Sequence, residues 1–268
     1  HVSNGLFRLD GRVAVVTGAA GLLGRAHCRA LADAGAIVYA CDLSARAAED
    51  VAIPLGPRHH GVALDVTSEE SILDLRTLLL EEHGRIDILV NNAAMNDAVE
   101  HASVDAQSVE TYPVQKFRRV LDVNVTGVFL TSRILGAVMA QAGRGSIINI
   151  GSTYGVVAPD QSLYRAPDGT QEFIKSAAYP ASKGAVVMLT AYFASYWGRR
   201  GVRVNTLSPG GVENGQPEHF VDAYAERTQI GRMAMPSDYA GALVYLASDA
   251  SNYMTGQNLI VDGGWTAW

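Results

Sequence analysis

Short apolar runs alternate with longer amphipathic segments along the whole chain. The runs are rich in β-branched residues and almost continuously apolar, as is typical of strands that helices cover on both faces. This alternation predicts repeated βαβ units and a parallel sheet. The seven expected strands cover residues 12–18, 36–42, 60–66, 86–92, 145–152, 202–209 and 258–264.

Segments with helical periodicity separate the apolar runs. Thr67 and Glu70 form the pattern of a capping box at the start of the second such segment. No internal repeat or Pro/Ser-rich linker divides the 268 residues, so we expect residues 1–268 to form one doubly wound α/β domain. The expected helices cover residues 22–34, 68–83, 114–141, 178–199 and 236–248.

Three irregular stretches interrupt the alternation, at residues 93–112, 156–177 and 210–235. Each of them follows a predicted strand. In an open parallel sheet, the loops that leave the carboxyl ends of the strands surround the ligand crevice. We therefore expect these three stretches to form the walls of a substrate site.

Composition narrows the class of partner. A net charge of -6 without a long basic run argues against a nucleic-acid surface or an anionic membrane surface. No apolar run reaches the roughly 20 residues that span a bilayer, and no charged-then-apolar leader precedes the first strand, so we expect a cytoplasmic protein. Cys28 and Cys41 lie among apolar neighbours without metal-ligand spacing, which predicts reduced core thiols and no metal site.

A glycine-rich turn, Thr17 to Gly24, joins the first expected strand to the first expected helix. Glycines permit a tight turn and let backbone N–H groups at a helix start approach a pyrophosphate. Such a turn alone is a weak signal, but its place inside a βαβ unit favours a dinucleotide site.

Asp42 ends the second expected strand, 18 residues beyond Gly24. A carboxylate there would accept hydrogen bonds from the adenosine ribose and repel a 2′-phosphate, which favours NAD over NADP. The alternative is that Asp42 caps the following segment, while Arg25 or Arg46 binds a phosphate.

Tyr179 and Lys183 are four residues apart in an expected helix, so the phenol and the ammonium share one face. A cation beside a tyrosine favours the phenolate and lowers the phenol pKa from its usual value of about 10. This makes the pair a candidate acid/base. The same spacing also arises by chance on solvated helix faces, so the surrounding motifs must decide.

Together these motifs resemble the classical short-chain dehydrogenases/reductases (SDRs), and the resemblance covers essentially the whole chain. It implies a Rossmann-type fold. The motifs, in the family's order, are the glycine turn, Asp65-Val66, Asn91-Asn92-Ala93-Ala94, Asn124, Ser152, the Tyr179/Lys183 pair and Pro209-Gly210.

The resemblance also implies roles. Tyr179 would exchange a proton with the substrate oxygen, Ser152 would hydrogen-bond that oxygen, and Lys183 would lower the tyrosine pKa and bind the nicotinamide ribose. Asn124 would hold a water that links Lys183 to solvent, although a buried asparagine can also tie the fourth strand to the long helix. The implied cofactor is NAD, at Gly18, Gly21, Leu22, Leu23, Gly24, Asp42, Leu43, Asp65, Val66, Asn92, Ala93, Ala94, Tyr179, Lys183, Pro209, Gly210 and Val212.

The sequence departs from the family pattern in several places. The turn reads TGxxGxxG, a spacing closer to the extended sugar-nucleotide branch, and Asn214 occupies the slot of a threonine that contacts the carboxamide. Ser152 and Tyr179 are 27 positions apart, about twice the family's usual gap. An insertion therefore lies beside the reaction centre.

The insertion is polar, which suits a hydroxyl-rich or anionic substrate better than an acyl chain or a steroid. Arg165 and Lys175 could pair with a carboxylate or phosphate. Alternatively, the insertion is solvated or packs against a neighbouring subunit. A weaker resemblance links the chain to proteins of bacterial sugar and nonulosonate pathways. The candidate substrate residues are Tyr154, Tyr164, Arg165, Lys175 and Asn214.

The leading hypothesis is an NAD(H)-dependent oxidoreductase that interconverts a secondary alcohol and a ketone on a polar, sugar-derived or anionic small molecule. The alternatives are an epimerase or dehydratase that retains NAD, and a non-catalytic cofactor sensor. Family members are commonly oligomers, and the aromatic segment 186–197 with Trp265 and Trp268 is compatible with buried interfaces in a homotetramer or dimer.

Overall fold

A parallel sheet of seven strands forms the centre of the protein, in the order β3-β2-β1-β4-β5-β6-β7. The computed structural model describes residues 5–96 and 107–268. Each strand lies within the range that the apolar runs predict, so the predicted fold class is confirmed. The strands are β1 Val13–Thr17, β2 Ile37–Asp42, β3 His60–Ala63, β4 Ile88–Asn91, β5 Gly145–Ile150, β6 Val202–Pro209 and β7 Asn258–Val261.

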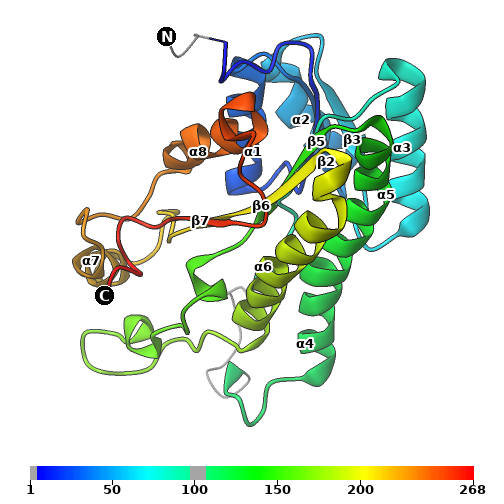
Figure 1. Ribbon diagram of the computed structural model, residues 1–268. Coiled ribbons are helices and arrows are strands. Elements are labelled where there is room, and N and C mark those ends of the chain that lie inside the picture. The colour runs from blue at the N-terminus through cyan, green and yellow to red at the C-terminus, as the bar shows by residue number, and fades with distance from the viewer. Residues whose placement is uncertain (1–4, 97–106) are drawn as a thin grey trace.

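Helices cover both faces of the sheet, as expected (Figure 1). Two of them were not predicted: α2 is short, and α7 lies inside the stretch 210–235 that was expected to be irregular. The capping-box prediction is also wrong, because Ser68 is the N-cap of α3 and its side chain accepts from the N–H of Ser71. The helices are α1 Leu22–Asp33, α2 Ala45–Ala52, α3 Glu69–His83, α4 Val114–Leu121, α5 Gly127–Ala142, α6 Ala178–Trp197, α7 Glu218–Arg227 and α8 Ala240–Ala247.

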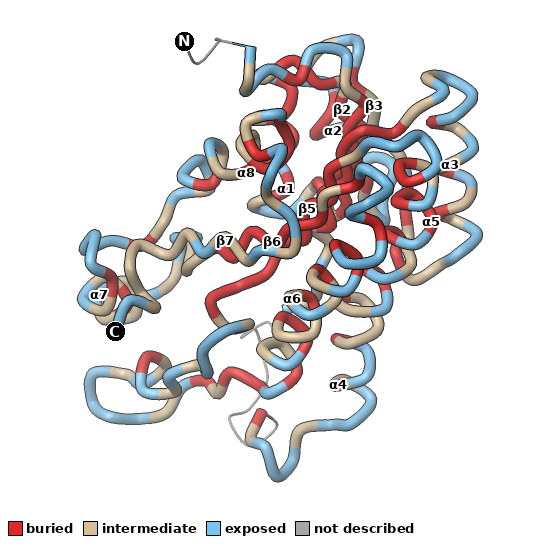
Figure 2. The backbone as a smooth tube through the Cα atoms, in the orientation of Figure 1, coloured by how far each residue is buried: buried red, intermediate tan, exposed pale blue. Residues whose placement is uncertain are grey.

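Successive strand residues point to opposite faces, and the core is divided accordingly. In β1, Ala14 and Val16 pack with α1 and α8, whereas Val13 and Val15 pack with α3, α5 and α6. Figure 2 shows the strands as the buried centre between these layers. Cys28 and Cys41 are free thiols, each 0% exposed in one of the two layers, which confirms the prediction of core thiols.

The long central helix differs from its prediction. The expected helix over 114–141 consists of α4, a π-helical turn Asp122–Thr126, and α5. This continuous run, Val114–Ala142, contains a window of mean hydropathy 1.5, so it is long and apolar enough to span a membrane, contrary to the sequence expectation. Within that window 56% of the residues are buried inside the protein, and α5 packs against β4, β5 and α3, as in a core helix.

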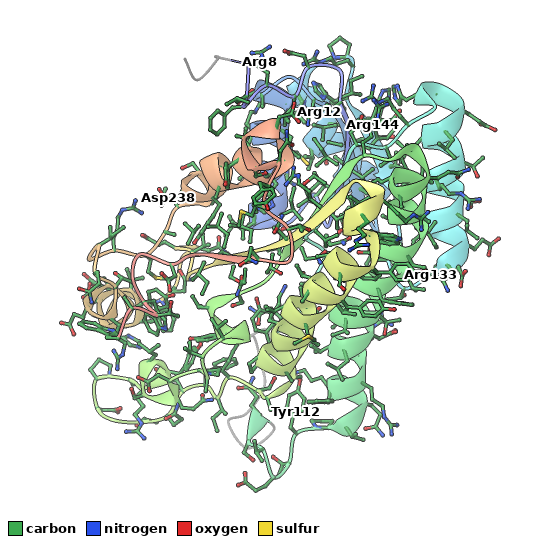
Figure 3. All side chains as sticks on the ribbon, viewed as in Figure 1. Arg8, Arg12, Tyr112, Arg133, Arg144 and Asp238 are labelled. Carbon is green, nitrogen blue, oxygen red and sulfur yellow. The ribbon has the colours of Figure 1, made fainter. Side chains whose placement is uncertain are left out.

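Different residues lie at the amino ends and at the carboxyl ends of the strands. Arg12 and Arg144 directly precede the amino ends of β1 and β5, and they lie at the opposite end of the molecule from Tyr112 (Figure 3). The segments that leave the carboxyl ends of β1, β4 and β5 all contribute to one cavity. Of the predicted wall 93–112, residues 97–106 lie outside the described residues.

Candidate active site

A cavity of about 580 Å³ lies at the carboxyl ends of the strands. It extends from Asp42, the last residue of β2, and Leu43 to Tyr179 and Lys183 on α6. Of the residues predicted to bind the cofactor, all line this cavity except Gly24, Gly210 and Val212. Gly210 instead lines a separate pocket of about 200 Å³ with Tyr224.

The turn between β1 and α1 requires glycine for steric reasons. Gly18 has φ 62°, in the left-handed region, and a Cβ there would lie 2.7 Å from the Cα of Ala93. A Cβ on Gly24 would clash with Ala19, which explains why Gly24 packs under the turn without lining the cavity. No side chain caps α1 at Gly21, so the positive end of the helix can bind a phosphate group. These features fit a dinucleotide.

Asp42 is built into the same turn. Its Oδ2 accepts from the N–H of Ala20 at 2.9 Å, and its Oδ1 accepts from the N–H of Leu43 at 2.9 Å. The N-cap of α2 is Ser44, so the alternative role of Asp42 as a helix cap is not observed. Neither Arg25 nor Arg46 lines the cavity, and Arg25 donates to the carbonyl of Ala20.

The segment after β4 is bonded to this turn. The hydroxyl of Thr17 accepts from the N–H groups of Asn92 and Ala93, at 3.1 and 3.0 Å. The side chain of Asn92 donates to the carbonyls of Thr17 and Gly18, at 3.0 and 2.9 Å. Asn91 is buried below the cavity and donates to Ser132 and Asn149. The cavity wall therefore begins at Asn92, the second residue of the motif.

Asp65 and Val66 form the wall after β3. The Oδ1 of Asp65 accepts from both the N–H and the hydroxyl of Thr67, which lowers the pKa of this carboxyl. The carboxylate therefore stabilises the turn from Asp65 to Thr67 at the cavity wall.

Tyr179 and Lys183 lie in the first two turns of α6, with the Lys183 ammonium 5.6 Å from the centroid of the Tyr179 ring. Lys183 is 4% exposed and donates to the carbonyl of Ile150 at 2.7 Å. Burial lowers the pKa of Lys183 to about 8. Lys183 is therefore almost entirely neutral at about pH 10, where an ordinary phenol ionises.

Burial raises the pKa of Tyr179, and the hydrogen bond with Ser152 acts in the opposite direction. The Tyr179/Lys183 spacing predicted that the neighbouring ammonium lowers this pKa, but the net shift is upward, so Lys183 by itself does not bring the ionisation of the phenol to neutral pH. Ser152 is 7% exposed, and its hydroxyl accepts from the N–H of Tyr154 at 3.1 Å. This bond orients Ser152 beside the phenol.

Asn124 is 1% exposed in the π-helical turn. Its Oδ1 accepts from the N–H of Met95, and its Nδ2 donates to the carbonyl of Met95 and to the hydroxyl of Ser182. Asn124 therefore ties the segment after β4 to the central helix, which is the structural role considered from the sequence. A water relay could use only the remaining lone pair of Oδ1.

The candidate substrate residues divide into two groups. The hydroxyls of Tyr154 and Tyr164 lie 3.3 Å apart. Burial raises the pKa of both phenols, and Tyr179 is close enough to raise them further by electrostatic repulsion. Lys175 is buried beside the Tyr179 ring. Arg165 and Asn214 are exposed. None of the five candidates lines the cavity of about 580 Å³, and no residue of the predicted walls 156–177 and 210–235 does, so the three candidates near Tyr179 lie beside the cavity and not in its wall.

Sequence reasoning missed several residues of the cavity wall. Met95 and Asn96 continue the wall after Ala94, and Arg119 and Val123 reach it from the central helix. Asn96, a polar residue two positions beyond the motif that follows the fourth strand, was a usable signal. Arg119 and Val123 lie on a helix without any motif, so only the packing of that helix reveals them.

The geometry of this site agrees with comparisons to known proteins. A family model described as enoyl-(acyl carrier protein) reductase matches residues 18–266. The chain belongs to the short-chain dehydrogenases/reductases. As an SDR of this kind, it is an oxidoreductase that acts on CH–OH groups with a nicotinamide dinucleotide.

Two relatives of this SDR are named as dehydrogenases of sugar alcohols. The chain is 39% identical to a D-threitol dehydrogenase of Mycolicibacterium smegmatis, over 97% of this chain and 95% of the relative. It is 38% identical to a galactitol 2-dehydrogenase (L-tagatose-forming) of Cereibacter sphaeroides, over 98% of both chains. The crystal structure of a gluconate 5-dehydrogenase from Burkholderia cenocepacia, in complex with NADP and tartrate, matches with a TM-score of 0.84 and 32% identity, over 98% of both chains.

Proposed function

We propose that this SDR is an NAD(H)-dependent dehydrogenase that interconverts a secondary alcohol and a ketone on a polyol or a related sugar-derived molecule. The observation that carries the proposal is the position of Tyr154, Tyr164 and Lys175 next to Tyr179. Two phenol hydroxyls and an ammonium offer a hydroxylated substrate several hydrogen-bond partners around the reacting carbon. D-Threitol and galactitol, named for two relatives, are polyols of this kind.

The proton-transfer step follows from the site's own residues. In the oxidation direction, the phenolate of Tyr179 takes the proton of the substrate hydroxyl, and Ser152 hydrogen-bonds the same oxygen. When bound, the nicotinamide ring supplies the acceptor for the hydride. Lys183, held at the cavity wall by the carbonyl of Ile150, stabilises the phenolate and binds the cofactor ribose.

Asp42 supports NAD as the cofactor. Its carboxylate lies at the cavity wall after β2 and is held there by the N–H groups of Ala20 and Leu43. A negative charge at this position opposes a 2′-phosphate and can bind ribose hydroxyls. The cations considered as alternatives, Arg25 and Arg46, lie outside the wall.

The test is turnover of a substrate panel by the purified protein. D-Threitol, galactitol and gluconate are offered with NAD or NADP, with cyclopentanol as an apolar comparison. We expect reduced cofactor to form fastest with a polyol and NAD. Tyr179→Phe should lower kcat by about 1000-fold, because a positioned acid/base contributes a factor of this order.

Tyr192→Phe is the matched control, because Tyr192 lies on the same helix and is 58% exposed. Cofactor binding without turnover of any hydroxylated substrate would contradict the proposal. Full activity of Tyr179→Phe would contradict the assigned proton transfer.

A further inference from the structure

Lys175 lies closer to the ring of Tyr179, the proposed acid/base, than Lys183 does, although Lys183 is on the same helix as Tyr179. Its ammonium is 4.5 Å from the centroid of the Tyr179 ring, whereas that of Lys183 is 5.6 Å away. Lys175 is 7% exposed, and its ammonium also contacts the Oδ1 of Asn96 at the cavity wall. The phenol is thus flanked by one cation from α6 and a second from the insertion.

The insertion holds Lys175 in this position through its backbone. The side chain of Gln161 accepts from the N–H of Lys175 and donates to its carbonyl, both at 2.9 Å. Gln171 in turn donates to the carbonyls of Gln161 and Phe173, at 2.9 and 2.7 Å. These bonds lock the two ends of the segment together, so Lys175 is presented by an ordered structure.

The other cation of the insertion points away from the site. Arg165 is exposed, and its guanidinium donates to the side chain of Gln171 at 3.0 Å. Arg165 and Lys175 therefore carry the same charge on the same segment with different surroundings. This difference provides a matched control.

Among the described residues, the titratable groups that face Tyr179 come from four elements. Lys183 belongs to α6, Lys175 to the insertion, Tyr154 to the turn Thr153–Gly155, and Tyr164 to the turn Gln161–Tyr164. Tyr154 and Tyr164 are neutral at working pH because burial raises their pKa values. Among these groups, the two lysines are therefore the source of positive charge.

Lys183 by itself keeps its positive charge only below about pH 8, because burial lowers its pKa to about 8. An ammonium close to an aromatic ring favours the ionised phenol by direct attraction. Two ammonium groups together lower the energy of the phenolate more than one does.

We propose that Lys175 is a second cation of the proton-transfer site, which acts through Tyr179 and is supplied by the insertion between β5 and α6. It is a positioning residue that favours the ionised form of the phenol. The inference rests on the proposed function in one respect, namely that Tyr179 transfers the proton.

The first test needs no turnover. The phenolate absorbance is titrated against pH in protein saturated with NAD, or with NADP if NAD does not bind, and the same titration of the Tyr179→Phe background is subtracted. Lys175→Met should raise the midpoint for Tyr179, the pH at which half of it is ionised, by about one unit, the size expected for loss of one nearby cation. Lys175→Arg should keep the midpoint near that of the parent protein, and Arg165→Met should leave it unchanged.

The second test is the pH profile of alcohol oxidation. In Lys175→Met, the acid limb of kcat/KM should move to higher pH by the same amount, so kcat/KM below that limb falls about ten-fold. Thermal unfolding shows whether the variant is folded, and Lys175→Gln serves as the second neutral variant if Lys175→Met is not.

The outcomes separate the two hypotheses. An unchanged Tyr179 midpoint in a folded neutral variant overturns the inference. A higher KM with an unchanged pH profile overturns it as well, because Lys175 then only binds substrate. A shifted midpoint without turnover of any alcohol supports the role of Lys175 and contradicts the proposed function.

Discussion

At the scale of single residues, Asp42 shows how one side chain serves both the fold and the proposed specificity. Its two oxygens accept from the N–H groups of Ala20 and Leu43, so the carboxylate closes the turn and remains at the cavity wall. The sequence position at the end of β2 predicted a carboxylate at this wall. The bond to Ala20 depends on the approach of two separate segments, so it could not be predicted.

The charge of Asp42 should decide between the cofactors. Asp42→Asn keeps an oxygen that can accept from Ala20 and removes the charge that opposes a 2′-phosphate. We expect the ratio of kcat/KM with NAD to kcat/KM with NADP to fall by about ten-fold, as for the loss of roughly 1.4 kcal/mol of discrimination. Steady-state kinetics with both cofactors measures this ratio.

Asp33→Asn is the control for this prediction, because Asp33 is an exposed residue at the other end of α1 and loses the same charge. An unchanged cofactor ratio in Asp42→Asn would show that Asp42 does not discriminate against the phosphate.

At the scale of elements, the strands were easier to predict than the helices. The apolar runs are continuous and end in glycine or polar residues, so each strand appears where expected. The helices α2 and α7 have 8 and 10 residues, which gives the periodicity little length in which to appear. The π-helical turn Asp122–Thr126 was not predicted either; it contains Asn124, whose hydrogen bond with Met95 joins two segments that are far apart in the sequence.

Those contacts should make Asn124 important for stability. Asn124→Ala leaves the N–H and the carbonyl of Met95 without these partners. We expect the free energy of unfolding to fall by about 2 kcal/mol, since a buried polar group that loses its partner costs an amount of this order. Denaturant unfolding, monitored by circular dichroism, measures the change.

Ser182→Ala is the matched variant, because it removes the third partner of Asn124 and leaves both bonds to Met95 intact. It should destabilise the protein less. An equal loss of unfolding free energy in the two variants would contradict the prediction, because the bonds to Met95 would then add nothing to stability.

At the scale of the whole molecule, α5 and α6 lie next to each other on one side of the sheet (Figure 1), and both carry exposed apolar side chains. Phe129 is 38% exposed, Met188 68%, Tyr192 58% and Tyr196 62%. The rings of Tyr192 and Tyr196 stack with centroids 6.1 Å apart, so this surface is ordered. A monomer seldom exposes a contiguous aromatic surface of this kind.

We therefore expect this surface to lie in an interface between identical subunits. The protein should have the mass of a dimer or a tetramer by light scattering, and the double variant Met188→Glu with Tyr192→Glu should shift the mass toward that of one chain, because charges do not bury without partners. Ile53→Glu adds a charge at another exposed apolar side chain and should not change the mass. A monomeric parent protein would contradict the expectation.

The sequence by itself determined the parallel sheet, the glycine turn and the Tyr179/Lys183 spacing, because each depends on local pattern within a few residues. It also located an insertion beside the reaction centre. Only the tertiary structure decided that Lys175 faces Tyr179 while Arg165 faces solvent. The insertion has no regular periodicity, so the direction of its side chains depends on hydrogen bonds such as those of Gln161, which form only when the segment is folded against the domain.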